Sequence, residues 1–258
     1  MNRGWLVLTF VFASFAQGQA PDALPFAVGE RLTYTVRTSK FGAGGRAVMS
    51  VTGPVDVRGT ETMLATFDVH VRWAFMSGDD NTKSWIDPRR MASLRFEKHE
   101  RRPFSFNNES VEITPENRSW MSSRGDSGTT VSNAPLDELS FIYFLRTITL
   151  LPDSVYSFDR HYDVRRTPTT VRIIKRETLT TPAGEFRTVE LEMRVKDATN
   201  YNGEGILHLW ISDDRCRLPV RIESTMSLLG TGVLVLESVV TPRCTHGDSP
   251  TPVWSNRR

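Results

Sequence analysis

The chain has 258 residues, 32 of them Lys or Arg and 30 Asp or Glu, so its formal net charge is only +2. A nearly neutral chain has no global field that would attract nucleic acid or an anionic membrane, so we expect no nucleic-acid partner. Its length suits one large β-rich domain.

The first twenty residues, MNRGWLVLTFVFASFAQGQA, have the pattern of a secretory signal peptide. Arg3 precedes an apolar run from Trp5 to Phe15, and small residues precede Pro21. An apolar run of about eleven residues is too short for a bilayer, which needs roughly twenty. We therefore expect removal of residues 1–20, no integral membrane segment after cleavage, and a soluble bacterial protein that is periplasmic or secreted.

The following chain is dominated by alternation of apolar and polar residues. It is clearest in ERLTYTVR, TMLATFDVHVRW and TVELEMRV, which begin at Glu30, Thr62 and Thr188. This alternation is typical of antiparallel strands with one face in water. We predict an all-β fold, an antiparallel meander that forms a curved sheet or half-open barrel, as a single domain over residues 21–244.

Two segments lack the alternation. The polar stretch 107–128 is rich in Ser, Asn and Gly, which favours a long loop or an irregular hairpin, and residues 245–258 have the composition of a disordered tail.

One substantial helix is predicted near residues 134–148, in SNAPLDELSFIYFLRTITLLP. A polar start at Ser132 or Asn133 and an early proline, Pro135, precede apolar residues at helical spacing. Its second half is apolar on nearly all sides, so we expect the helix to be buried against the sheet.

A weak internal repeat relates KSWIDPRRMASLRFEK to HLWISDDRCRLPVRIES. Both contain Trp-Ile before a turn, and the ending Leu94 to Glu97 aligns with Val220 to Glu223. The hypothesis is two similar meanders, about 25–130 and 150–244, joined through the helix; chance similarity between hairpins is the alternative.

The blocks PFAVGERLTYTV, LDELSFIYFLR, TPAGEFRTVELEM and LHLWISDDRCRLPVRI, in this order, resemble the bacterial exported family known as domain of unknown function 3108. The resemblance implies a periplasmic all-β protein of undetermined activity and transfers no catalytic residues. Half-open barrels that carry lipids or lipoproteins between envelope membranes are similar in architecture only.

The last of these blocks predicts a hairpin with Asp213 and Asp214 as its two-residue turn, so that Leu209 faces Leu218 and Trp210 faces Arg217. A further turn about Gly230 places Val220 opposite Val240. The same register places Cys216 opposite Cys244, and we predict a disulfide between them. One feature disfavours this register, because it places Glu223 opposite Glu237 and like charges repel.

Two sets of residues are candidates for ligand contact. The basic segment could bind anionic glycan or lipid headgroups, although a solvated strand and turn is the alternative. Polar helix residues could line one end of a cavity, with tryptophans as apolar contacts; the alternative for Arg146 is stabilisation of the helix end. The basic set is Arg89, Arg90, Arg95, Lys98, Arg101 and Arg102, and the other set is Asp137, Ser140, Tyr143, Arg146, Trp85 and Trp210.

The sequence contains no recognisable catalytic or metal-binding motif. The five histidines are scattered, and no G-x-S-x-G or phosphate-binding glycine loop occurs, so we expect no metal and no cofactor. A catalytic set that assembles only in space is left open.

Three classes of function remain. The favoured class is non-enzymatic binding of an amphiphile or a glycan in a concave β-sheet. The alternatives are an envelope adaptor or assembly factor with a protein partner, and a polysaccharide-directed hydrolase or lyase.

Overall fold

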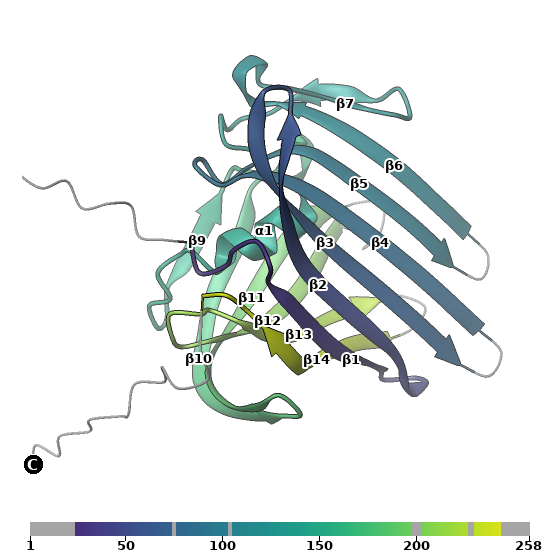
Figure 1. The fold of residues 1–258 in the computed structure, drawn as a ribbon, viewed down its shortest axis with the longest axis vertical. Coiled ribbons are helices and arrows are strands. Elements are labelled where there is room, and N and C mark those ends of the chain that lie inside the picture. The colour runs from purple at the N-terminus through teal and green to yellow at the C-terminus, as the bar shows by residue number, and fades with distance from the viewer. Residues whose placement is uncertain (1–23, 74–75, 103–104, 198–202, 227–229, 244–258) are drawn as a thin grey trace, which may run out of the picture.

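The computed structural model describes residues 24–73, 76–102, 105–197, 203–226 and 230–243 (Figure 1). This part of the chain forms 14 strands, one α-helix and two short 3-10 helices. In chain order they are β1 (Arg31–Thr38), β2 (Gly42–Val57), β3 (Thr60–Trp73), β4 (Met76–Asp87), β5 (Ala92–Arg102), β6 (Ser105–Thr114), η1 (Pro115–Asn117), β7 (Ser119–Ser122), β8 (Ser127–Thr129), α1 (Glu138–Leu145), β9 (Val155–Phe158), η2 (Val164–Arg166), β10 (Thr169–Thr181), β11 (Gly184–Asp197), β12 (Gly203–Ser212), β13 (Pro219–Met226) and β14 (Gly230–Val240).

All the strands belong to one antiparallel sheet. Its order is β8-β7-β6-β5-β4-β3-β2-β1-β14-β13-β12-β11-β10-β9, so each strand pairs with its neighbour in the chain except where β1 meets β14. The sheet begins at β8 and ends at β9, which do not pair, and it curves around α1 (Figure 1). The predicted fold class, a curved or half-open antiparallel sheet with one helix, is confirmed.

The alternation in the sequence decides which face of each strand is inside. Leu32, Tyr34 and Val36 of β1 are buried, as are Val189 and Leu191 of β11, and they belong to one hydrophobic core with the apolar side of α1. A strand that turns every second side chain inward gains about 1.5 to 3 kcal/mol for each large apolar side chain it buries. We call the surface that faces α1 the inner face and the opposite surface the outer face.

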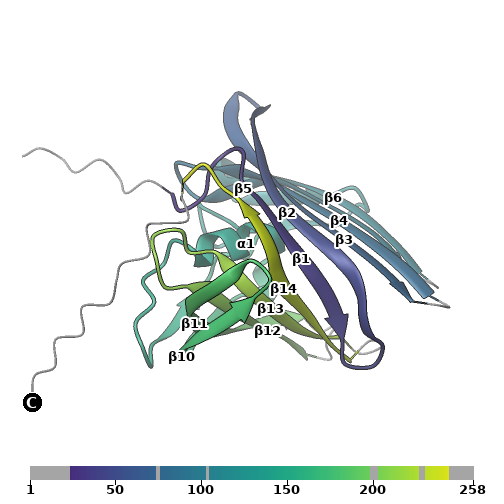
Figure 2. The ribbon, with the colours of Figure 1, turned by 60° about the horizontal axis from the view of Figure 1, so that its bottom comes forward.

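Helix α1 lies inside the curve between the two halves of the sheet (Figures 1 and 2). Its eight residues are fewer than the predicted 134–148, because Asp137 is extended and caps its N-terminus, and residues 131–134 form bends. Leu136 exchanges backbone hydrogen bonds with Arg160 and Tyr162, at 2.5 and 2.9 Å. No helix in the described ranges has the length and apolar character needed to cross a membrane.

Of the two alternatives predicted for 107–128, the long loop is wrong and the irregular hairpin is confirmed, because β6 and β7 pair antiparallel through the short helix η1. Most of this segment is β6, β7 and β8, and Val111, Ile113 and Trp120 point inward from it into a second, smaller core cluster. The abundant polar residues conceal a regular alternation, because most of them lie on the face away from that cluster.

The predicted turn at Asp213 and Asp214 is also wrong. The β12–β13 connection spans residues 213–218, and Trp210 pairs with Arg221 rather than Arg217, while Leu209 pairs with Ile222. Asp214 Oδ1 accepts hydrogen bonds from Ser212 Oγ and from the backbone N–H groups of Cys216 and Arg217, at 2.8, 2.9 and 3.1 Å. These bonds stabilise a wide loop where a tight turn was expected.

The register between β13 and β14 also differs from the predicted one. Glu223 pairs with Val233, which avoids the expected repulsion from Glu237, and Val240 pairs with Arg31 of β1 instead of Val220. The predicted register, in which Cys216 lies directly opposite Cys244, is therefore wrong. Cys216 is buried in the loop before β13, whereas Cys244 lies outside the described residues, so the disulfide itself stays a prediction.

The two segments of the weak repeat form hairpins with the same geometry. Trp85 of β4 pairs with Arg95 of β5, and Trp210 of β12 pairs with Arg221 of β13. In each pair the guanidinium carbon lies over the indole ring, at 5.4 and 5.0 Å from its centroid. In both hairpins the register shifts immediately after the tryptophan.

Replacement of Asp214 tests the loop. We expect Asp214→Ala to lower the free energy of unfolding by about 1 to 3 kcal/mol, because buried donors lose their acceptor. Asp214→Asn keeps the Oδ1 acceptor and should lose less than half as much. Urea unfolding of both variants measures this, and equal losses would show that the hydrogen bonds to Oδ1 do not matter.

Candidate functional site

Two of the predicted helix residues, Asp137 and Ser140, start the helix. The Asp137 carboxylate accepts from the backbone N–H groups of Leu139 and Ser140 at 2.9 and 2.8 Å, and Ser140 Oγ accepts from the Asp137 N–H at 2.8 Å. This reciprocal arrangement is a capping box. Both residues are fully buried, and Ser84 Oγ of β4 donates to Asp137 Oδ2 at 2.5 Å. Burial raises the pKa of Asp137 to about 6, although bonds from Ser84, Ser93 and Ser140 oppose the rise.

Arg146 ends the helix and is 1% exposed. Its guanidinium donates to both carboxylate oxygens of Glu30, at 2.6 and 2.9 Å, and to the backbone carbonyls of Pro25 and Cys216, at 3.2 and 3.1 Å. Glu30 is equally buried. Arg146 therefore has a carboxylate partner inside the protein, as the alternative interpretation of this residue required.

Tyr143 belongs to the same buried group. Its ring contacts that of Phe26 edge to face, at 4.8 Å between centroids, and Arg146 lies over both rings. The Tyr143 hydroxyl has no hydrogen-bond partner in the described part of the chain, and burial raises its pKa well above the ordinary value.

Trp85 and Trp210 lie on the outer face, so the six predicted ligand residues do not form one site. The neighbours Ser84 and Leu209 point inward, to Asp137 and to the main core respectively. Trp210 is buried nonetheless, and its Nε1 donates to Glu177 of β10 at 2.7 Å. The β10–β11 hairpin crosses this side of the sheet (Figure 2), and Ala183 N donates to the carbonyl of Leu236 at 3.4 Å.

The predicted basic segment is divided between the two faces of β5. Arg95 and Arg101 point outward, whereas Lys98 points inward, and Arg89 is exposed on the preceding turn. The outward side chains are largely occupied: Arg90 pairs with Asp87 and Glu116, and Arg95 pairs with Glu112. The side chain of Arg102 lies outside the described part. These residues do not form one continuous cationic patch.

The inner face has an apolar part that α1 does not fully cover. Half-buried side chains continue the main core along the strands beyond the helix. They come from both halves of the sheet and are Phe67, Val69 and Val71 of β3, Val195 of β11, Leu207 of β12 and Leu234 of β14. We call this set the apolar strip.

Polar side chains occupy the neighbouring inner face of β4, β5 and β6. Lys98 Nζ lies 3.2 Å from Glu100 Oε1, and Asn107 Nδ2 donates to Glu100 Oε2 at 2.9 Å. Across the β4–β5 ladder, Thr82 pairs with Lys98 and Asp80 pairs with Glu100. Burial lowers the pKa of Lys98, but the carboxylates of Asp80, Glu138 and Glu100 raise it by more than burial lowers it. The pKa therefore lies above the ordinary value, and Lys98 stays charged.

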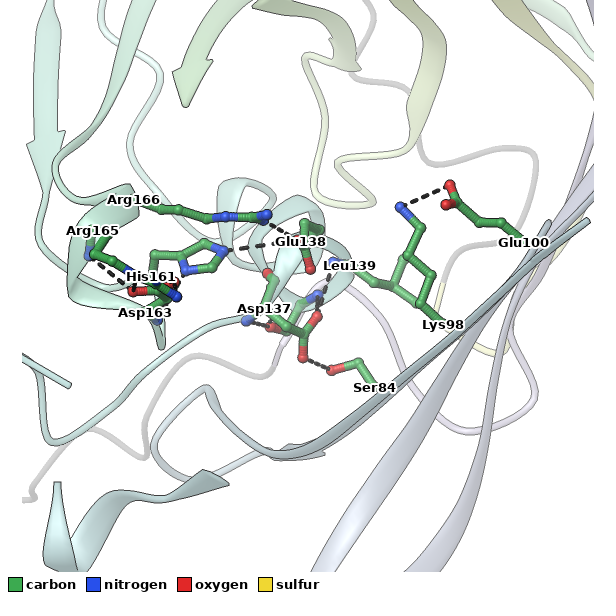
Figure 3. Close-up of polar contacts among 11 residues, drawn as sticks. Ser84, Lys98, Glu100, Asp137, Glu138, Leu139, His161, Asp163, Arg165 and Arg166 are labelled. Atoms are coloured by element: carbon green, nitrogen blue, oxygen red, sulfur yellow. Dashed lines mark hydrogen bonds and ion pairs between the residues drawn. The ribbon is translucent and has the colours of Figure 1, made fainter. Parts of the chain in front are cut away.

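Glu138, in the first turn of α1, joins this charged side to the segment after the helix (Figure 3). Arg166 Nη1 donates to Glu138 Oε1 at 2.5 Å, and His161 Nε2 lies 4.0 Å from the same oxygen. Burial raises the pKa of Glu138, but electrostatic interactions with Arg166, His161 and Lys98 lower it more, so its pKa lies below the usual value. We call Glu138, His161, Arg166, Lys98 and Glu100 the Glu138 cluster.

The apolar strip and the Glu138 cluster share one face of one sheet. The structure has two surface depressions of about 440 and 450 Å³, and the second of them touches the apolar strip at Val71. The first is on the outer face, where Thr35, Arg37, Arg221 and Val235 are among its lining residues, and the second is beside Gly45 and His70. Among the described residues no group of three or more His, Cys, Asp or Glu side chains is placed to hold a metal ion.

Most residues of the Glu138 cluster were not predicted from the sequence. Lys98 was grouped with outward-pointing arginines, His161 was weighed only as a metal ligand, and Glu138 and Arg166 were not singled out. A signal was present for β5, because Phe96, Lys98 and Glu100 occupy alternate positions and Phe96 is buried. No comparable pattern connects Glu138 to His161, because the segment that carries His161 has no regular period.

Replacement of Asp137 tests its protonation. An acid whose pKa is raised to about 6 in the fold, from 3.8, destabilises the folded state by about 3 kcal/mol above pH 6 and not below pH 4. Asp137→Asn caps a helix equally well but does not ionise. We expect the stability of the variant relative to the native protein to rise by up to this amount between pH 4 and pH 7, measured by urea unfolding. A difference that is the same at both pH values would contradict the burial effect.

A double-mutant cycle tests the buried pair. Arg146→Met leaves the Glu30 carboxylate buried without a partner, and we expect a loss of about 3 to 5 kcal/mol in the free energy of unfolding. Arg146→Met combined with Glu30→Gln should recover a large part of that loss. Additive losses would show that the two side chains are not coupled.

Comparison with known proteins agrees with this fold. The chain is similar in structure to a β-barrel-like protein of domain of unknown function DUF1849 from Brucella abortus, with a TM-score of 0.58 and 12% identity, over 84% of this chain and 98% of the other. A Bacteroides fragilis protein with a YmcC-like fold has 13% identity over 84% of this chain and 98% of its own, but a TM-score of only 0.31. No curated protein matches the chain. The profile of the family described as protein of unknown function, DUF3108, matches residues 33–237, so the chain belongs to this family.

Proposed function

We propose that this protein is an exported, non-enzymatic binding protein for an amphiphile, which lies along the inner face of the sheet. The observation that carries the proposal is the division of that face into the half-buried apolar strip and the adjoining Glu138 cluster. An acyl chain would cover the strip, and a polar headgroup would meet the charged side. A glycan would find few polar partners on the strip.

The free energy gained per buried methylene favours a ligand with a long acyl chain. Each methylene removed from water contributes about 0.8 kcal/mol, and association costs at least about 4 kcal/mol. Ten methylenes would then leave a net gain of about 4 kcal/mol, which corresponds to millimolar affinity, whereas sixteen would leave about 9 kcal/mol and micromolar affinity. The proposed ligand therefore carries an acyl chain of about sixteen carbons.

Export is the part of the proposal that rests on the sequence alone. The leader pattern of residues 1–20 supports it, and these residues lie outside the described part. The periplasm or the exterior of a bacterium is where such a protein would meet free amphiphiles.

Two matched substitutions test the binding face. Val69 lies on the apolar strip opposite Asp80, and Val48 lies on the outer face opposite Asp68; both are half-buried. Lysine at either position gains a carboxylate across the ladder, so both variants should fold. We expect Val69→Lys to weaken binding of a fluorescent sixteen-carbon fatty acid at least tenfold, because it places a charge under the chain.

Val48→Lys is the control, and we expect it to bind the fatty acid as the native protein does. Thermal unfolding of both variants verifies the fold. Equal affinity in the two variants, or no binding by the native protein, would reject the inner face as the binding surface.

A further inference from the structure

The sheet has one end at which β1, β3, β5, β11 and β13 finish and β2, β4, β6, β12 and β14 begin (Figures 1 and 2). The register shows this, because Thr38 of β1 pairs with Gly42 of β2 and with Gly232 of β14, and the neighbouring strands alternate in direction. Helix α1 contacts β4 through Ser84, near the opposite end of that strand. We call the end where β1 finishes the distal end.

Exposed cations gather at the distal end. Four of them lie within three residues of these strand ends, and none has an ion-pair partner among the residues that the structure describes: Arg37 of β1, Arg72 of β3, Arg101 of β5 and Lys196 of β11. Of the described carboxylates, only Glu100 lies as close to a strand end, and it is buried beside Lys98. The next exposed carboxylate, Asp79, is bound to His70. The distal end is therefore locally cationic, although the chain as a whole is nearly neutral.

Apolar groups reach the same end. Phe106 of β6 is 73% exposed, and the guanidinium carbon of Arg101 lies 5.8 Å from its ring centroid. The apolar strip also extends to this end, because Val71 pairs with Gly78 in the third residue of β4. An exposed aromatic ring beside cations is typical of protein surfaces that lie at the boundary between lipid headgroups and acyl chains.

Both surface depressions lie at the distal end. Arg37 and Thr231 are among the residues that line the depression of about 440 Å³, and Arg72 and Ser77 are among those that line the depression of about 450 Å³. Each depression thus contains an exposed guanidinium without a carboxylate partner in the described part of the chain. A guanidinium binds phosphate through paired N–H donors, so each depression suits one phosphate group.

We infer that the distal end docks on the surface of a bilayer that contains anionic phospholipid. Phe106 enters the headgroup region, and Arg37 and Arg72 bind lipid phosphates. The apolar strip then opens toward the acyl chains at Val71. This inference extends the proposed function, because an amphiphile would pass between the bilayer and the strip with little exposure to water. Docking itself does not require a ligand on the strip.

A bilayer matches this surface better than an acidic protein does. The cations are distributed over β1, β3, β5 and β11, and so over both halves of the sheet. A lipid surface supplies phosphate groups across the whole of such an area and an apolar layer beneath them. It therefore accommodates both the dispersed charges and the exposed ring of Phe106.

Vesicle binding tests the docking surface. Protein recovered from the periplasm is mixed with vesicles of phosphatidylcholine alone, or of equal parts of phosphatidylcholine and phosphatidylglycerol, and binding is measured by flotation. At low ionic strength we expect at least about tenfold tighter binding to the anionic vesicles, because each cation near such a surface contributes. Molar salt should remove the difference, since exposed charges are then screened.

Two matched double variants locate the charges. Arg37→Gln with Arg72→Gln removes two cations from the distal end, and each loss should weaken binding to anionic vesicles about fivefold. Arg89→Gln with Arg118→Gln is the control, because it makes the same change in net charge at exposed positions near the opposite end of the strands. The control should change the affinity less than about twofold.

A second matched pair tests the apolar contact. Phe106→Ser should weaken binding to anionic vesicles by at least about fivefold, because the ring no longer enters the headgroup region. Met121→Ser is the control, since Met121 is 62% exposed on β7, away from the distal end. It should leave the affinity unchanged. All these positions are exposed, and thermal unfolding of each variant verifies the fold.

The outcomes separate docking from the proposed function. Equal affinity for the two kinds of vesicle, or equal losses in the two double variants, overturns docking; an acidic protein is then the partner that the charges fit. Arg37→Gln with Arg72→Gln should bind the fluorescent fatty acid in solution as the native protein does, and Val69→Lys should still bind anionic vesicles. Absence of fatty-acid binding by the native protein with vesicle binding intact rejects the proposed function and leaves docking in place.

Discussion

The buried ion pair between Arg146 and Glu30 joins three separate parts of the chain. Glu30 and the Pro25 carbonyl come from the segment before β1, Arg146 ends α1, and the Cys216 carbonyl belongs to the β12–β13 loop. Two charges removed from water cost several kcal/mol each, and this arrangement repays the cost only because the guanidinium meets both carboxylate oxygens and two carbonyls. The helix is thereby attached to the seam where the two halves of the sheet meet.

Three of the sequence blocks that resemble the family supply these contacts. The block that begins at Pro25 contributes Glu30 and Tyr34, the helix block contributes Tyr143 and Arg146, and the block around Cys216 accepts hydrogen bonds from both. Tyr34, for example, donates its hydroxyl proton to the Pro219 carbonyl at 2.9 Å. These residues hold the helix and the loop to the seam, and none of them belongs to the Glu138 cluster.

Features that depend on neighbouring residues were predicted correctly from the sequence, whereas features that depend on distant parts of the chain were not. Alternation is a local property, and it predicted the inner faces of β1, β3 and β11, because burial on one side of a sheet imposes period two. Register depends on loop geometry: hydrogen bonds to Asp214 stabilise a wide β12–β13 loop, and the β13–β14 ladder independently differs from the predicted register, since it closes at Met226 and Gly230. The helix was predicted too long, because backbone bonds from Leu136 to Arg160 and Tyr162 override the earlier polar start at Ser132 or Asn133.

The Glu138 cluster was beyond sequence patterns for a different reason. Alternation places Lys98 and Glu100 on the same face as Phe96, but it does not show which side chains from other parts of the chain meet them there. His161 and Glu138 meet because the chain after α1 returns beside Leu136, which is a property of the folded chain alone.

The two matching hairpins explain how one sheet acquires a divided inner face. On the outer face they share the tryptophan and arginine pair, Trp85 with Arg95 and Trp210 with Arg221. Inward-facing positions at the same offsets from these pairs differ in character: Ser84 corresponds to Leu209, Thr82 to Leu207, and Lys98 to Ser224. The hairpins thus keep the same outward frame while their inner faces diverge, one polar around Lys98 and the other apolar around Leu207. Because β1 and β14 join the halves into one continuous sheet, this difference places an apolar and a charged surface side by side, which is the condition that binding of an amphiphile requires.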